Sequence, residues 1–150
     1  MTGVQTCALP ISTYPQYSPA TSGSTLDFVL ESVRRLAPGA AIHTVPDWHL
    51  LDGYLKNLSD PVIAQLRQWA EAGVDTAACA LIYVAHSMPA TFIKKGDPYE
   101  ILTRATVAAV HGRVRKALAA EGHETWLDGL LSDREFPDRK STRLNSSHRL

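Results

Sequence analysis

An unbroken apolar run at residues 77–85, followed directly by a histidine, constrains the fold of this chain more than any other stretch. The run contains Ile82, Tyr83 and Val84, and its length is typical of a strand buried on both faces in a parallel sheet. His86 would then lie at the carboxyl end of that strand, where open α/β sheets gather their ligands. An imidazole there suits metal binding or proton transfer near neutral pH, but it can equally bond its own loop. Residue type alone leaves both interpretations open.

Helical patterns lie on both sides of this run. Apolar residues at helical spacing predict helices at residues 26–37, 50–72 and 99–120, with a kink or a restart of the second helix at Pro61. A further short strand is predicted at residues 40–45. The order helix, strand, helix, strand, helix is typical of a parallel sheet with crossover helices. We therefore predict an α/β fold with few strands and flanking helices.

Turn and capping residues mark where these helices begin and end. Ser24 or Thr25 is predicted to cap the first helix, while Gly73 and Gly122 are predicted to stop the second and third. A hydroxyl-rich helix start could also grip an anion, so that alternative stays open. Asp97 stands just before the third helix, where it is predicted to cap the helix rather than to touch a ligand.

Composition limits the classes of partner. The chain has 150 residues, 45% of them hydrophobic, with 15 basic and 15 acidic residues, which argues against strong attraction to nucleic acid or to an anionic membrane. No apolar run approaches the roughly 20 residues of a membrane-spanning helix, and no signal-peptide pattern opens the chain. The two cysteines are too few for a disulfide framework, and Cys79 is predicted to be a buried, inert thiol.

The two ends, residues 1–11 and 139–150, resemble translations of sequencing-adapter read-through. We therefore expect both to be artefacts and residues 12–138 to be the genuine piece, in which acidic residues outnumber basic ones. Ordinary polar tails are the alternative.

Two longer strings carry a resemblance to a known family. The strings His-Ser-Met-Pro at residues 86–89 and Gly-Asp-Pro-Tyr at residues 96–99 closely resemble a segment of ferrochelatases, which insert ferrous iron into a porphyrin. Tyr-Pro-Gln-Tyr-Ser at residues 14–18, followed by Thr-Ser-Gly-Ser at residues 21–24, is similar to the segment that lines one wall of their porphyrin cleft. The resemblance implies a fragment of the Rossmann-like parallel sheet of class II chelatases. It covers about the middle third of such an enzyme, and residues 12–138 would span the junction of its two similar domains.

The resemblance also implies which residues take part in catalysis and binding. It assigns both the catalytic and the metal-binding role to His86, because a neutral imidazole is a metal ligand and a base. The family pairs this histidine with a glutamate on a later strand that this sequence does not reach, so we expect no turnover from the chain alone. Residues 123–138 also lack the Gln-Ser-Arg, Gly-Pro and Trp pattern usual at that place. The other implied site residues are substrate contacts at Tyr17, Ser18, Ser87 and Pro89, and a candidate for metal delivery at His49.

Ferrous iron and a porphyrin, protoporphyrin IX or coproporphyrin III, are the implied substrates. No tightly bound cofactor is expected, because Pro19 stands where the animal enzymes place a cysteine that helps hold an iron–sulfur cluster. The implied activity is that of a lyase of haem biosynthesis, located in the cytoplasm or at a membrane periphery, with its oligomeric state open. Two alternatives remain: a cobalt or sirohydrochlorin-type chelatase, and a tetrapyrrole-binding or non-functional fragment without catalysis.

Overall fold

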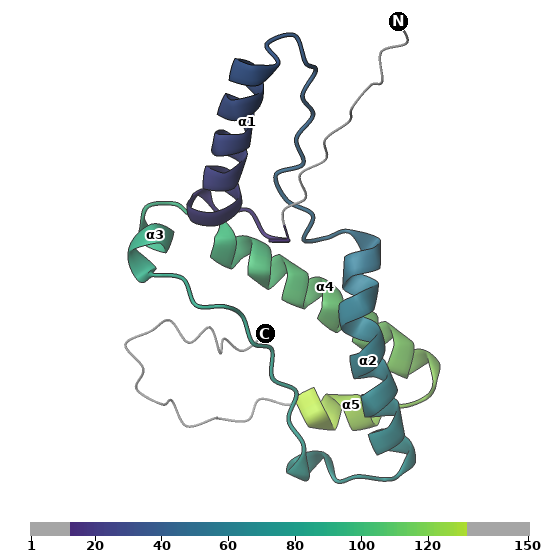
Figure 1. The fold of residues 1–150 in the computed structure, drawn as a ribbon. Helices are drawn as coiled ribbons and strands as arrows, with labels where there is room; N and C mark the ends of the chain where they lie inside the picture. Colours follow the sequence, from purple (N-terminus) through teal and green to yellow (C-terminus); the bar gives the residue numbers. More distant parts are fainter. Residues whose placement is uncertain (1–12, 132–150) are drawn as a thin grey trace, which may run out of the picture. The chain divides into compact units, whose positions relative to one another are not determined.

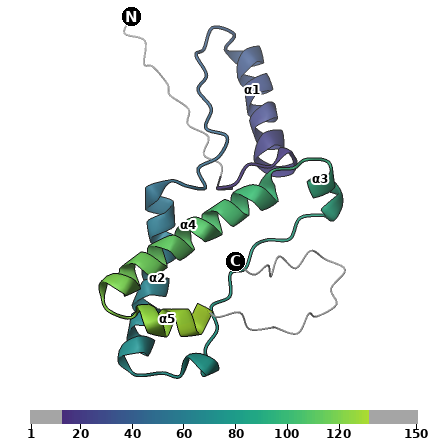
Figure 2. The same ribbon diagram turned by 180° about the vertical axis from the view of Figure 1, so that it is seen from behind.

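The computed structural model describes residues 13–131, so both ends predicted to be artefacts, residues 1–11 and 139–150, lie outside the described residues. The chain divides into two compact units, Met1–Asp47 and Trp48–Leu150. Figures 1 and 2 show the helices of both units from opposite sides. The first unit holds a π-helical turn at Pro19–Gly23 and α1 at Ser24–Leu36; the second holds α2 at Asp52–Glu71, a 3-10 turn at Thr76–Ala78, α3 at Ala90–Lys94, α4 at Tyr99–Ala120 and α5 at Glu124–Leu131.

The predicted α/β fold class is wrong for the part of the chain that the structure describes. Residues 13–131 contain no strand, and the predicted parallel sheet is absent there. Residues 40–48 and 79–89 carry the apolar, β-branched composition of strands but have no regular secondary structure. Composition favours an extended backbone, yet a ladder also needs a second strand to accept and donate its hydrogen bonds. Neither segment has such a neighbour among the described residues.

The hydrophobic core of the second unit lies where α2 crosses α4 and α5 closes the end of the pair (Figure 1). The predicted helices at 50–72 and 99–120 are confirmed, since α2 and α4 fall within those ranges. On α4 the buried residues recur every fourth position, which forms one buried, mostly apolar stripe along the helix. The buried hydrophobic members of the core are Leu55, Leu66, Val110, Val114, Leu118, Leu127 and Leu130.

The apolar run before His86 lies on this helical core with alternate side chains turned inward. Cys79, Leu81 and Tyr83 are partly buried and pack against the core. Ile82, which lies between Leu81 and Tyr83, is 65% exposed, and Val84, which follows Tyr83, is 89% exposed. The alternation is that of an extended chain covered on one face, so the predicted burial on both faces is wrong. Cys79 is likewise only half-buried.

The predicted helix ends are confirmed at two glycines. Gly73 has φ 64° and Gly122 has φ 81°, a left-handed conformation that glycine adopts without steric cost. Pro61 lies inside α2, which runs unbroken from Asp52 to Glu71, so the predicted restart does not occur. In the described range each helix is too short or too polar to cross a membrane.

Local hydrogen bonds of hydroxyl groups shape the first unit. The Oγ of Ser18 accepts from the N–H of Ala20 at 3.1 Å, and the N–H of Ser18 donates to the Oγ of Ser22 at 3.2 Å. Ser24 and Thr25 are already helical and donate back to a carbonyl of the preceding turn. The prediction that one of them caps α1 is therefore wrong, because Ser18 starts the helical path five residues earlier, at Pro19.

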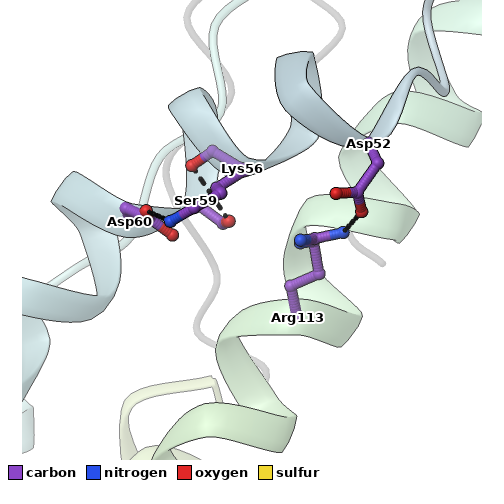
Figure 3. A network of polar contacts seen from close by, with 5 residues as sticks. All are labelled: Asp52, Lys56, Ser59, Asp60 and Arg113. Carbon is purple, nitrogen blue, oxygen red and sulfur yellow. Dashed lines mark hydrogen bonds and ion pairs between the residues drawn. The ribbon is translucent and has the colours of Figure 1, made fainter.

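Charged side chains connect α2 to α4 at the start of α2. Figure 3 shows Arg113 of α4 donating from Nη1 to Oδ1 of Asp52 at 2.7 Å. One turn along α2, Lys56 pairs with Asp60, and the Oγ of Ser59 donates to the carbonyl of Lys56 at 3.3 Å (Figure 3). Exposed pairs of this kind contribute little to stability, and of these two only the pair of Arg113 with Asp52 joins the two helices.

A second charged contact joins the far ends of the same two helices. The guanidinium of Arg67 donates from Nε and Nη2 to the two carboxylate oxygens of Glu121 at 2.7 and 2.5 Å. These hydrogen bonds raise the pKa of Arg67 and lower the pKa of Glu121. The two-point geometry makes this the more specific of the two contacts between the helices.

Candidate functional site

His86 lies where the apolar segment leaves the helical core, and its side chain is exposed. Ser87 and Pro89, the neighbouring predicted substrate contacts, are exposed as well, whereas Met88 between them is half-buried. The helix α3 begins immediately after Pro89. The structure thus presents the predicted catalytic residue and two predicted substrate contacts on one short exposed stretch.

The main chain at His86 is tied to the first residue of α4. The hydroxyl of Tyr99 donates to the carbonyl oxygen of His86 at 3.2 Å across a separation of 13 residues. The N–H of Tyr99 donates in turn to Oδ1 of Asp97 at 2.9 Å, so this carboxylate satisfies the first N–H of α4, although the N-cap position itself is held by Pro98. Gly96 has φ 92°, so the turn into this cap needs a glycine. The loop that starts at His86 is therefore closed by Tyr99.

A second contact holds the same segment three residues before His86. The hydroxyl oxygen of Tyr83 lies 3.5 Å from Nδ1 of His111 on α4, and the two ring centroids are 6.3 Å apart. Burial raises the pKa of Tyr83 to about 12. Burial, and then the charge of Arg115, lowers the pKa of His111. Both contacts come from α4, so this helix fixes the segment on either side of residues 84 and 85.

His49, the predicted candidate for metal delivery, lies just before α2 and is only 8% exposed. Its carbonyl oxygen accepts a hydrogen bond from Oγ1 of Thr106 on α4 at 3.3 Å. Trp48 beside it packs edge-on against Tyr54, with ring centroids 5.0 Å apart. These surroundings make His49 part of the packing between α2 and α4. Its predicted role in metal delivery stays a prediction.

Tyr17 and Ser18, the predicted porphyrin contacts, belong to the first unit, whereas His86 belongs to the second. Ser18 is fully buried, and its hydroxyl is engaged in capping the π-helical turn. Tyr17 is half-buried, and its hydroxyl lies so close to Gly23 that a Cβ there would come within 2.9 Å of it. The segment from Tyr17 to Gly23 is thus folded upon itself, and any side chain at Gly23 would force neighbouring atoms to move.

Within residues 13–131, no three histidine, cysteine, aspartate or glutamate side chains gather into a group that could hold a metal ion. A metal contact at His86 would therefore rest on one exposed imidazole.

Sequence reasoning missed the roles of Tyr99 and Tyr83. Tyr99 closes the Gly-Asp-Pro-Tyr string, but nothing in the order of residues shows that its hydroxyl reaches back to His86. Tyr83 is the one residue with a hydroxyl group in the middle of an apolar run. A buried tyrosine hydroxyl usually has a hydrogen-bond partner, so its position in the run was the available sequence signal for such a contact.

Comparison with known proteins places these features in a family. The family model described as Ferrochelatase matches residues 2–127, which include the whole stretch from His86 to Tyr99. The match defines the chain as a member of a family of chelatases. The chain belongs to the ferrochelatase family.

Individual relatives agree with that match. The chain is 31% identical over 106 residues to a ferrochelatase of Rhodopseudomonas palustris, which covers 71% of this chain and 29% of that protein. It is 33% identical over 98 residues to a ferrochelatase of Methylococcus capsulatus, covering 65% and 28% of the two chains. A ferrochelatase of Thioalkalivibrio sulfidiphilus is 35% identical over 98 residues, covering 65% and 25%. The chain thus spans less than a third of the length of these curated relatives, and no solved structure shows significant similarity to it.

Proposed function

We propose that this chain carries the metal-contacting part of a ferrochelatase, an enzyme that inserts ferrous iron into a porphyrin. The observation that supports it most is the exposed imidazole of His86 on a stretch whose main chain is tied to α4 by Tyr99. That stretch carries the strings that resemble the family and lies inside the region that the family model matches. The proposal covers the lyase reaction of haem biosynthesis and a place in the cytoplasm, with a membrane-peripheral place as the alternative.

The chemistry asks for a weak metal contact and a base. Fe²⁺ enters the macrocycle as two pyrrole N–H groups lose their protons, so two protons leave for each metal ion inserted. A neutral imidazole can offer its lone pair to the metal ion or to a proton, but not to both at once. The exposed ring of His86 can do either, because its backbone, and not its side chain, makes the contact with Tyr99. No tightly bound cofactor takes part in this proposal, because Pro19 stands where the resemblance places a cysteine that helps hold a cluster.

Binding measurements on the full chain test the site. Co²⁺ serves as a stable stand-in for Fe²⁺, and its broadening of histidine ring signals in NMR spectra reports which imidazole it contacts. We expect Co²⁺ to broaden the His86 signals first and His86→Ala to remove that binding, while His43→Ala, at an exposed histidine of the first unit, leaves it unchanged. Equal Co²⁺ binding by the native chain and by His86→Ala would contradict the proposal.

The substrate is tested by fluorescence titration with coproporphyrin III, protoporphyrin IX and sirohydrochlorin. We expect one of the two porphyrins to bind more tightly than sirohydrochlorin. Preference for sirohydrochlorin would favour the sirohydrochlorin-type chelatase, and porphyrin binding without any Co²⁺ contact at His86 would favour a tetrapyrrole-binding protein without catalysis.

Activity is tested in a chimera, because the chain spans less than a third of its relatives. Residues of this chain replace the matching segment of the Methylococcus capsulatus ferrochelatase, and iron insertion is measured together with porphyrin binding as the control for folding. We expect insertion by the chimera and its loss in the chimera that also carries His86→Ala. A chimera that binds porphyrin and still inserts iron without His86 would show that another group does the work.

A further inference from the structure

We propose that Tyr99 is a positioning residue for His86: its hydroxyl sets the main chain at His86 and thereby the direction in which the imidazole projects. This inference rests on the proposed function, since it assumes that His86 contacts the metal ion. It adds a residue that acts on the site only through another, by a hydrogen bond to a carbonyl oxygen 13 residues earlier in the chain.

Hydrogen bonds at the start of α4 hold the main chain of Tyr99 in place. Tyr99 is the first residue of α4, and the Oδ1 of Asp97 fixes its N–H at 2.9 Å. Asp97 is itself 9% exposed, and its own N–H donates to the carbonyl of Phe92 at 3.1 Å. The loop between His86 and Tyr99 therefore contains hydrogen bonds of its own, so the Tyr99 hydroxyl reaches the His86 carbonyl from a defined position.

His86 needs such a contact because little else in its own stretch holds it. Residues 79–89 have no regular secondary structure, and the side chains of His86 and Ser87 are exposed. The anchor before it is Tyr83, whose hydroxyl contacts His111 on α4. A bond to the His86 carbonyl restricts the two backbone dihedrals that flank that peptide, and these set where the Cα–Cβ bond points. With both anchors on α4, the imidazole has a limited range of directions.

The test separates positioning from general stability. Tyr99→Phe keeps the ring and removes the hydroxyl that donates to His86. Tyr54→Phe is the matched control, because Tyr54 is also a half-buried tyrosine on a helix of this unit and packs edge-on against Trp48. His86→Ala reports whether the proposed site binds metal at all. Each variant of the full chain is titrated with Co²⁺ alone, its thermal unfolding is followed, and NMR gives the His86 carbonyl ¹³C shift and the order parameter of the His86 ring.

We expect Tyr99→Phe to move the His86 carbonyl shift, to lower the ring order parameter and to weaken Co²⁺ binding about threefold to tenfold, as loss of one net hydrogen bond implies. Its unfolding midpoint should change no more than that of Tyr54→Phe. Equal Co²⁺ binding by the two phenylalanine variants, while His86→Ala abolishes binding, would overturn the positioning role and leave the proposed function standing. Weakening that merely follows a loss of stability would also overturn it. Unchanged binding by His86→Ala would overturn both proposals.

Discussion

The hydroxyl oxygen of Tyr83 lies 3.5 Å from Nδ1 of His111, and this contact fastens the apolar segment to α4 three residues before His86. Both partners are half-buried, and burial disfavours the charged form of each. Burial raises the pKa of Tyr83 to about 12 and, together with Arg115, lowers the pKa of His111. The contact therefore belongs to a neutral phenol and a neutral imidazole.

The free energy of unfolding should decrease as the pH is lowered below neutrality, because of His111. Its pKa in the folded chain lies below the ordinary value of 6.5, so the unfolded chain binds more protons as the pH drops below that value. The contribution is fully present above about pH 6.5, declines as the pH falls toward the lowered pKa, and then levels off. Urea unfolding at a series of pH values measures it, and His111→Gln should reduce the decline.

His43 offers the control for this pH dependence, because it is an exposed histidine of the first unit. His43→Gln should leave the pH profile of stability as it is in the native chain. A decline of equal size in the His111→Gln and native chains would assign the pH dependence to other groups.

Two threonines on α4 should respond oppositely to the same substitution. The hydroxyl of Thr106 can donate to either of two carbonyl oxygens. Its Oγ1 lies 3.3 Å from the carbonyl oxygen of His49 and 3.0 Å from that of Leu102. The Oγ1 of Thr103 is buried without a hydrogen-bond partner among the described residues. Thr106→Val should cost about 1 kcal/mol of unfolding free energy, whereas Thr103→Val should be neutral or stabilising.

Urea unfolding of both valine variants checks this pair. Since valine matches threonine in shape, packing changes little and the hydroxyl decides the sign. A larger loss at Thr103 than at Thr106 would contradict the two hydrogen-bonding environments.

Truncation of Leu118 should destabilise the second unit strongly. Leu118 is fully buried on α4, so Leu118→Ala loses the transfer free energy of its side chain and leaves a cavity, at a cost of about 2–5 kcal/mol. Ile101 on the same helix is 72% exposed, and Ile101→Ala should cost less than about 1 kcal/mol. Comparable losses measured by denaturant unfolding would mean that the buried stripe of α4 does not carry the core.

The helices could be predicted from the sequence because their signals are local. Periodic apolar residues predicted α2 and α4, and the first and last residues of α4 agree with the prediction. Asp97 accepts the first N–H of that helix, and Gly122 follows its end. The short α3 and α5 were not predicted, because five or eight residues give too few repeats for a periodic pattern.

The predictions that were wrong concern features that depend on contacts between residues far apart in the chain. The run at residues 77–85 has the composition of a buried strand, but pairing requires a second strand, which periodicity cannot supply. The exposure of Val84 and the burial of His49 follow from the packing of α4 and not from their neighbours in sequence. His86 was a candidate from its motif, whereas the hydroxyl of Tyr99 that reaches its carbonyl is visible only in the folded chain.

Two glycines, Gly112 inside α4 and Gly122 just after it, provide the last prediction. Gly122 ends the helix with φ 81°, where any Cβ is strained, so Gly122→Ala should cost about 1 kcal/mol even though nothing lies within 4 Å of the added Cβ. Gly112 lies in the helix interior, also with open space around a Cβ, and Gly112→Ala should stabilise the chain by about 0.5–1 kcal/mol. Thermal unfolding of the two alanine variants measures the difference, and since both add the same methyl group, only the backbone conformation can set opposite signs. Destabilisation by Gly112→Ala would mean that α4 does not run as a regular helix through that position.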